Sequence, residues 1–240
     1  MFGYNDPIEV GALLGMTEEL RMTSQEILDL LAPHISERRR ERIDQVVTTR
    51  CKSIVPVLDG IFDTGNIAAV LRTAEGLGAL NAHIIDTQPV KKVSARVTQG
   101  ADKWLDLTTW KDPTACVTHL QSQGFQVVAT HLEAAVPLET IDFTRPTALV
   151  LGNERDGVCE EVAAAADHRC IIPMRGFVQS FNISVAGALS MYEATRQRQD
   201  KLGKVGDLSA REMQILKAVY YLRAVNQGER LVTRLLGLQA

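Results

Sequence analysis

Short apolar runs and amphipathic stretches alternate along most of the chain. Six apolar runs have the length of a β-strand, at residues 54–58, 82–86, 105–110, 125–130, 147–151 and 170–173. The stretches between them have helical periodicity, as after Gly65, where Ile67, Val70 and Leu71 share one face. Strands that alternate with helices favour an α/β fold with a mainly parallel sheet and helices on both of its faces.

Both ends of the chain are patterned as helices. Thr23 and Ser209 each stand three residues before a glutamate, which is the arrangement of a capping box at a helix N-terminus. The first box predicts a short helix stopped by Pro33, and the second predicts a helix that ends at Gly228. Ser36 predicts another helix just before the first strand. We therefore expect an N-terminal helical extension at 1–50, a central domain at 51–197 and a C-terminal helical extension at 198–240.

The composition is that of a soluble globular protein. Hydrophobic residues make up 45% and charged residues 23% of the 240 positions, close to the usual values. No apolar run approaches the ~20 residues that a membrane span needs, and the N-terminus lacks the basic start of a secretory signal. The four cysteines show no CxxC or metal-binding spacing. We expect a cytoplasmic protein with no membrane anchor and no metal.

The net charge of −3 is unevenly distributed. Residues 1–33 carry one basic and six acidic side chains, whereas 36–50 carry five basic and three acidic ones. The central residues 51–195 carry 11 basic and 16 acidic side chains, and 196–240 carry nine and four. Basic flanks on an acidic core suggest a surface for nucleic-acid phosphates, with solvated helix faces as the alternative. The leading RNA-binding candidates are Arg38, Arg39 and Arg42, whose guanidinium groups match phosphate oxygens.

Two polar loops follow the last two apolar runs. The first is GNERDG at 152–157, and the second is MRGFVQSFN at 174–182. Loops at the carboxyl ends of parallel strands are where α/β proteins bind ligands, because backbone amides and helix N-termini point there. The chain contains no GxGxxG sequence, so a dinucleotide-binding site is unsupported.

Three segments together resemble the motifs of the SPOUT (SpoU) class of RNA 2′-O-methyltransferases. They are GNIAAVLRT at 65–73, LVLGNERDGV at 149–158 and IPMRGFVQSFNISVAGALSMYE at 172–193, in the order in which that family has them. The resemblance implies S-adenosylmethionine as the cofactor, RNA as the substrate and no metal. It also implies a deep trefoil knot and a homodimer whose active site spans the subunit boundary, with the Leu189 and Met191 region buried between chains.

The resemblance also assigns the site residues. It places Arg72 at the ribose 2′-hydroxyl, either as a general base or as an electrostatic stabiliser of the developing alkoxide. The second role suits a guanidinium better, because arginine keeps its proton at any working pH. The residues that position the hydroxyl would be Asn66, Glu154, Ser180 and Asn182. The cofactor would be bound by Thr130, His131, Leu151, Gly152, Ile172, Met174, Phe181 and Ser184, where Phe181 replaces the family's more frequent leucine.

Within the class, the short basic extensions resemble the tRNA enzymes that act on guanosine 18 of the D-loop. The acidic segment 1–33 is longer than expected for that subgroup. Another tRNA or ribosomal RNA ribose is the alternative substrate. A non-catalytic RNA-binding protein with the same fold is a second alternative, and a small-molecule α/β enzyme is a third. The presence of Asn66, Arg72, Glu154 and Asn182 favours an enzyme.

Overall fold

The computed structural model describes residues 7–14, 16, 19–86, 100, 103–131, 135–153 and 155–237. The chain divides into two compact units. One is continuous, from Arg50 to Asp207, and the other combines the two ends, Phe2–Thr49 and Leu208–Ala240. No helix in these described ranges is long and apolar enough to cross a membrane.

The central unit contains a seven-stranded sheet in the order β5-β4-β3-β8-β6-β9-β7, and every neighbouring pair is parallel. This confirms the predicted parallel α/β fold. The central strands β3 and β8 are buried along their whole length, because both faces are covered. The strands are β3 (Ile54–Asp59), β4 (Asn81–Ile85), β5 (Asp106–Trp110), β6 (Gln126–Thr130), β7 (Val136–Pro137), β8 (Thr147–Leu151) and β9 (His168–Ile171).

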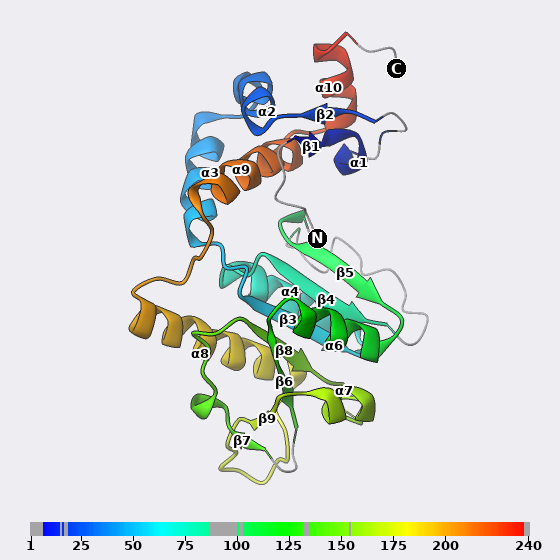
Figure 1. The fold of residues 1–240 in the computed structure, drawn as a ribbon, viewed down its shortest axis with the longest axis vertical. Helices are drawn as coiled ribbons and strands as arrows, with labels where there is room; N and C mark the ends of the chain where they lie inside the picture. The colour runs from blue at the N-terminus through cyan, green and yellow to red at the C-terminus, as the bar shows by residue number, and fades with distance from the viewer. Residues whose placement is uncertain are drawn as a thin grey trace. The chain divides into compact units, whose positions relative to one another are not determined.

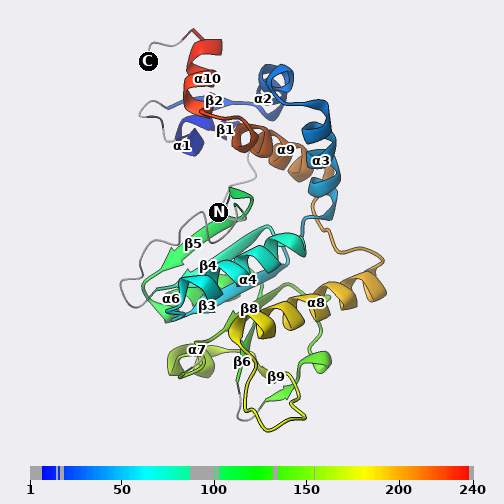
Figure 2. The same ribbon diagram turned by 180° about the vertical axis from the view of Figure 1, so that it is seen from behind.

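Helices cover both faces of this sheet, as predicted (Figures 1 and 2). One apolar layer joins the sheet to helices α4 (Thr64–Gly76) and α8 (Ile183–Leu202). A second layer joins it to α6 (Pro113–Ser122) and α7 (Glu160–Ala165) on the other face. A short 3-10 helix, Leu138–Thr140, precedes β8. The site described below depends on α4 and α8, which pack against each other.

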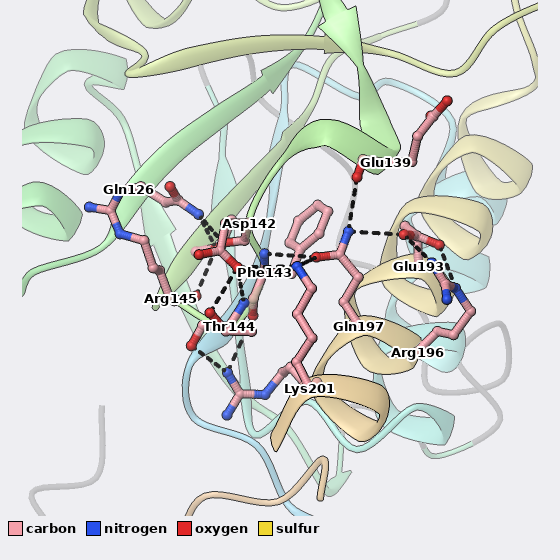
Figure 3. Close-up of polar contacts among 12 residues, drawn as sticks. Gln126, Glu139, Asp142, Phe143, Thr144, Arg145, Glu193, Arg196, Gln197 and Lys201 are labelled. Atoms are coloured by element: carbon pink, nitrogen blue, oxygen red, sulfur yellow. Dashed lines mark hydrogen bonds and ion pairs between the residues drawn. The ribbon is translucent and has the colours of Figure 1, made fainter. Parts of the chain in front are cut away.

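Gly187 allows the close approach of α8 to its neighbours. A β-carbon at this position would lie 3.0 Å from Leu151 Cδ1 and 3.4 Å from Val70 Cγ2. The second half of α8 is fixed to the segment before β8, where Gln197 accepts a hydrogen bond from the Phe143 amide and donates to the Glu139 carbonyl (Figure 3). These contacts hold α8 against the core at both Gly187 and Gln197.

Some element boundaries differ from the sequence predictions. Helix α4 begins at Thr64 rather than after Gly65, since Asp63 is its N-cap and accepts a hydrogen bond from the Asn66 amide at 2.8 Å. Strand β9 ends at Ile171, two residues before the predicted end at Pro173, a residue that has no N–H to donate to a ladder. Helix α8 continues to Leu202, beyond the end predicted for the central domain at residue 197.

The second unit is built from both ends of the chain. Helices α2 and α3 pack against α9, and α1 contacts α10. Both predicted capping boxes are present, at Thr23 and at Ser209. The elements are β1 (Ile8–Glu9), α1 (Val10–Leu14), β2 (Arg21–Met22), α2 (Ser24–Leu31), a 3-10 turn (Ala32–His34), α3 (Glu37–Thr49), α9 (Ala210–Ala224) and α10 (Gly228–Leu235).

The structure corrects two expectations for the chain ends. The helix after Ser209 ends at Ala224 rather than Gly228, and a further helix, α10, begins at Gly228. Between them Gln227 has a φ of 50°, in the left-handed region that a helix cannot continue through. The N-terminal extension also contains more than helices, because β1 and β2 pair as a short antiparallel ribbon.

Candidate functional site

The loop after β8 forms a tight turn that depends on glycine. Asn153 and Gly157 exchange two backbone hydrogen bonds of 3.0 Å each, and the Asn153 side-chain oxygen accepts from the amides of Arg155 and Asp156. A β-carbon at Gly152 would lie 2.0 Å from the Gly157 carbonyl carbon, closer than atoms can approach. Only glycine at position 152 therefore permits this turn.

The second polar loop ends at Asn182, the N-cap of α8. Its side-chain oxygen accepts from the Ser184 amide at 2.9 Å and from the Ser184 hydroxyl. Its amide nitrogen donates to the Asn66 side-chain oxygen in the first turn of α4, at 3.3 Å. This bond brings together the first and third of the three sequence segments, although 116 positions separate the two residues.

A pocket of about 330 Å³ opens at the carboxyl ends of β6, β8 and β9. Its size and its mixture of apolar side chains with a few polar groups are typical of a small-molecule site. Seven of the predicted site residues line it: Thr130, His131, Gly152, Ile172, Met174, Ser180 and Phe181. Other lining residues were not among the predicted site residues, namely Asn153, Arg155, Asp156, Gly157, Cys170, Ile171, Gln179, Ile183 and Ala186.

Two predicted cofactor residues do not line this pocket. Leu151 is fully buried in the apolar layer under α8, because its position in β8 turns its side chain toward the helix. Ser184 lies in the first turn of α8, with its hydroxyl engaged by Asn182. The residues that follow Leu151 reach the pocket instead, since they form the turn itself.

Comparison with known proteins identifies the family to which this chain belongs. Residues 53–192 match the model of the SpoU rRNA Methylase family. A tRNA (guanosine(18)-2′-O)-methyltransferase from Aquifex aeolicus is 34% identical over 200 residues, which are 82% of this chain and 95% of that protein. The chain belongs to the SpoU methylase family. It is therefore a methyltransferase.

Solved structures agree with this membership. The crystal structure of the A. aeolicus TrmH/SpoU tRNA modifying enzyme superposes with a TM-score of 0.71 and 34% identity, over 79% of this chain and 98% of that one. An AdoMet-bound rRNA methyltransferase from Sinorhizobium meliloti superposes with a TM-score of 0.55 and 29% identity, over 64% of this chain and 59% of that one. The SpoU family's cofactor is S-adenosylmethionine.

Arg72 projects from the exposed side of α4 in this SpoU methylase. Its neighbours on the opposite side, Val70 and Leu71, are fully buried. Within the described part of the chain its guanidinium group makes no hydrogen bond or ion pair, and Arg72 does not line the pocket. Glu154, the remaining predicted catalytic residue, lies outside the described residues.

The predicted RNA-binding arginines lie on α3, in the unit formed by the chain ends. Arg38, Arg39 and Arg42 are all exposed, and they line a polar hollow together with Ser36, Glu41 and Gln45. Ile43 and Val47 are the buried residues of the same helix. The arginines thus occupy the polar side of α3, as its periodicity predicts.

The buried His83 lies in a cluster of aromatic rings. Trp110 Nε1 donates to His83 Nδ1 at 2.9 Å, and the His119 ring stacks on His83 and lies tilted against Trp110. Burial, with His119 nearby, lowers the pKa of His83 to about 4, so its imidazole is neutral and acts as an acceptor. This cluster lies between β4, β5 and α6 and supports a structural role.

Proposed function

We propose that this protein transfers the methyl group of S-adenosylmethionine to the ribose 2′-hydroxyl of guanosine 18 in the D-loop of tRNA. The observation that carries the proposal is the Asn66–Asn182 hydrogen bond, which joins the first segment to the third beside the pocket. The similarity to the A. aeolicus tRNA (guanosine(18)-2′-O)-methyltransferase, which covers 95% of that protein, supports tRNA as the substrate. A tRNA substrate also agrees with the expected cytoplasmic location.

The pocket residues fit the cofactor. Ile172, Met174 and Phe181 provide apolar surface for an adenosyl group, and the turn from Gly152 to Gly157 brings backbone groups to the pocket wall. The cofactor supplies a methyl group on a positively charged sulfur, so the transfer needs no metal. The Thr130 hydroxyl donates a hydrogen bond to the Val150 carbonyl at 3.1 Å. It is therefore not free to donate a hydrogen bond to the cofactor.

Arg72 acts on the nucleophile rather than on the cofactor. Its exposed guanidinium stabilises the negative charge that develops on the 2′-oxygen, while the proton leaves to solvent or to a substrate phosphate. Asn66, Asn182, Ser180 and Glu154 orient the ribose and the adjacent phosphate. This role requires Arg72 to stand close to a methyl donor, yet it does not line the pocket of its own chain.

A homodimer explains this separation, with Arg72 of one protomer completing the pocket of the other. Helix α8 supports such an interface, since Val185, Leu189 and Tyr192 form an exposed apolar stripe on it, with Leu189 at 40% exposure. Met191 is excluded from the interface predicted for it, because it is already buried in its own core. The proposal includes the family's trefoil knot for the chain path that forms the pocket.

The basic side of α3 binds the tRNA backbone. Arg38, Arg39 and Arg42 are exposed on one helix, and Arg42 has only a weak contact of 3.5 Å to Gln45. Guanidinium groups held on a helix can pair with several phosphates of a folded RNA. The specificity for one nucleotide comes from the residues around the pocket instead.

Incorporation of labelled methyl groups tests the substrate. Purified protein would be incubated with labelled S-adenosylmethionine and either a tRNA transcript, the same transcript with guanosine 18 replaced by a 2′-deoxy residue, or a ribosomal RNA fragment. We expect label only in the unmodified tRNA. Label in the ribosomal fragment alone would favour the alternative that the S. meliloti structure represents.

A further inference from the structure

Asp59 is a buried carboxylate that none of the three segments includes. It is the last residue of β3 and is only 2% exposed. The five residues before it are also buried, in the middle of the sheet. Strand β3 pairs with β8 up to Leu58 and Leu151, so Asp59 lies where β8 gives way to the pocket loop. A buried carboxylate is costly unless it is hydrogen-bonded or paired with an opposite charge.

Asp59 forms a hydrogen bond with the C-terminal end of that loop. Asp59 Oδ2 accepts a hydrogen bond from the Cys159 amide at 2.7 Å, across 100 positions of sequence. Cys159 is the residue at which the loop ends and α7 begins. The next residue of the same strand end, Gly60, has a φ of 61°, and a β-carbon there would lie 3.6 Å from Asn153 Nδ2. The end of β3 therefore binds one end of the turn through Asp59 and lies close to the other end at Gly60.

The turn between β8 and Cys159 forms one wall of the pocket. Gly152, Asn153, Asp156 and Gly157 all line the pocket and lie between β8 and Cys159. The Asn153–Gly157 pairing makes the turn a closed hairpin, so a shift at Cys159 moves the wall as one piece. A wall 1 Å out of place is enough to weaken a preorganised site.

Asp59 does not stabilise the fold by its charge. Burial raises the pKa of its carboxyl, and the hydrogen bond from Cys159 offsets this only in part. A raised pKa means that ionisation above the ordinary carboxyl range costs folding stability. An apolar side chain would avoid that cost, whereas an oxygen acceptor at this place orders the loop.

We propose that Asp59 is a positioning residue for S-adenosylmethionine, acting through its hydrogen bond to the Cys159 amide on the loop that walls the pocket. The inference rests on the proposed function, because it takes the ligand of the pocket to be this cofactor. Asp59 itself touches neither the cofactor nor the RNA.

The test compares three substitutions in the full-length protein by calorimetric titration with S-adenosylmethionine. Asp59→Ala removes the oxygen that accepts from the Cys159 amide. Asp59→Asn keeps an acceptor oxygen but has no charge. Asp167→Ala is the matched control, because Asp167 Oδ2 also accepts from a backbone amide at 2.7 Å, that of Val127, but near the start of β6, at the opposite end of this strand from the pocket residue Thr130. Circular dichroism would establish that each variant is folded.

We expect Asp59→Ala to raise the cofactor Kd about tenfold or more, a loss of about 1.4 kcal/mol. Asp59→Asn should stay within about threefold of wild type, and Asp167→Ala should bind as wild type even if it melts earlier. Should Asp59→Ala fail to fold, Asp59→Leu provides an apolar substitute of similar size without an acceptor, for which we expect the same weakened binding.

Equal affinities of wild type and folded Asp59→Ala or Asp59→Leu would overturn the inference, and so would an Asp59→Asn protein as weak as the alanine variant. Both results leave the proposed function standing, because wild type would still bind the cofactor. A wild-type protein that bound no S-adenosylmethionine would instead refute the proposed function, and the inference with it.

Discussion

Asn182 and Asn66 are joined by a hydrogen bond of 3.3 Å between the first turns of α8 and α4. The same Asn182 side chain caps α8 through its oxygen and reaches Asn66 through its nitrogen. The helix that borders the pocket and the helix that carries Arg72 are thereby held in one arrangement. We therefore expect substitutions of Asn182 to affect both the pocket and the placement of Arg72.

Asn182→Ala should impair both cofactor binding and methyl transfer. It removes the cap, a loss of about 1 kcal/mol of stability, and it also removes the bond to Asn66. Asn182→Asp is the matched control, since a carboxylate still caps the helix but cannot donate to Asn66. We expect the aspartate variant to melt like wild type and yet to show a reduced kcat. Full activity in the aspartate variant would show that the Asn66 contact is dispensable.

Arg72→Ala should abolish transfer with little effect on cofactor affinity. Removing one group that stabilises a developing oxyanion typically lowers kcat about 10²- to 10³-fold, and Arg72 stands apart from the pocket of its own chain. We expect the Kd for S-adenosylmethionine, measured by calorimetry on the free protein, to stay within a few-fold of wild type. A variant that no longer binds the cofactor would mean that Arg72 has been assigned to the wrong step.

Leu189→Asp should convert the proposed dimer into monomers. A charge placed in the apolar stripe of α8 would have to be buried without a partner at the interface. Leu107→Asp is the matched control, because Leu107 is 40% exposed like Leu189 but lies on the edge strand β5. Light scattering at micromolar concentration should give a dimer mass for wild type and Leu107→Asp only. A monomeric wild type that retains activity would contradict the shared active site.

Replacing Arg38, Arg39 and Arg42 together by Ala should reduce the salt dependence of tRNA binding. Each phosphate contact releases counterions and contributes about −0.9 to the log-log slope on duplex RNA, with a smaller value on single strands. We expect the slope from ~50 to 200 mM salt, measured by filter binding, to flatten by about two to three units. The apparent KM for tRNA should rise while the cofactor Kd is unchanged. Equal slopes would assign these arginines to an ordinary solvated face.

Sequence patterns predicted what depends on short-range chemistry. The buried strand Thr147–Leu151 and the capping box at Thr23 were both found where the residues indicated, because apolar runs and cap hydrogen bonds are local. The start of α4 lies at Thr64, slightly before the start predicted after Gly65, since Asp63 caps the helix and accepts a hydrogen bond from the Asn66 amide. The break at Gln227 had no signal, because a left-handed glutamine is not marked by its neighbours.

The pocket was predictable only in part. Its loops were visible as polar segments after apolar strands, and Gly152 and Phe181 were among the residues named. The sequence could not tell that Leu151 turns into the core while Asn153 and Gly157 form the wall, because that depends on the hairpin between them. The support from Asp59 was likewise invisible, since its partner Cys159 is 100 positions away.

The most direct measurement of the central claim is mass spectrometry of a nuclease digest of tRNA after reaction with the protein and S-adenosylmethionine. The account predicts a single added methyl group, located on the ribose of guanosine 18, and no such product with Arg72→Ala. A methyl group on a base, a methylated ribose at another position alone, or an unmodified tRNA under conditions where the protein binds its cofactor would contradict it.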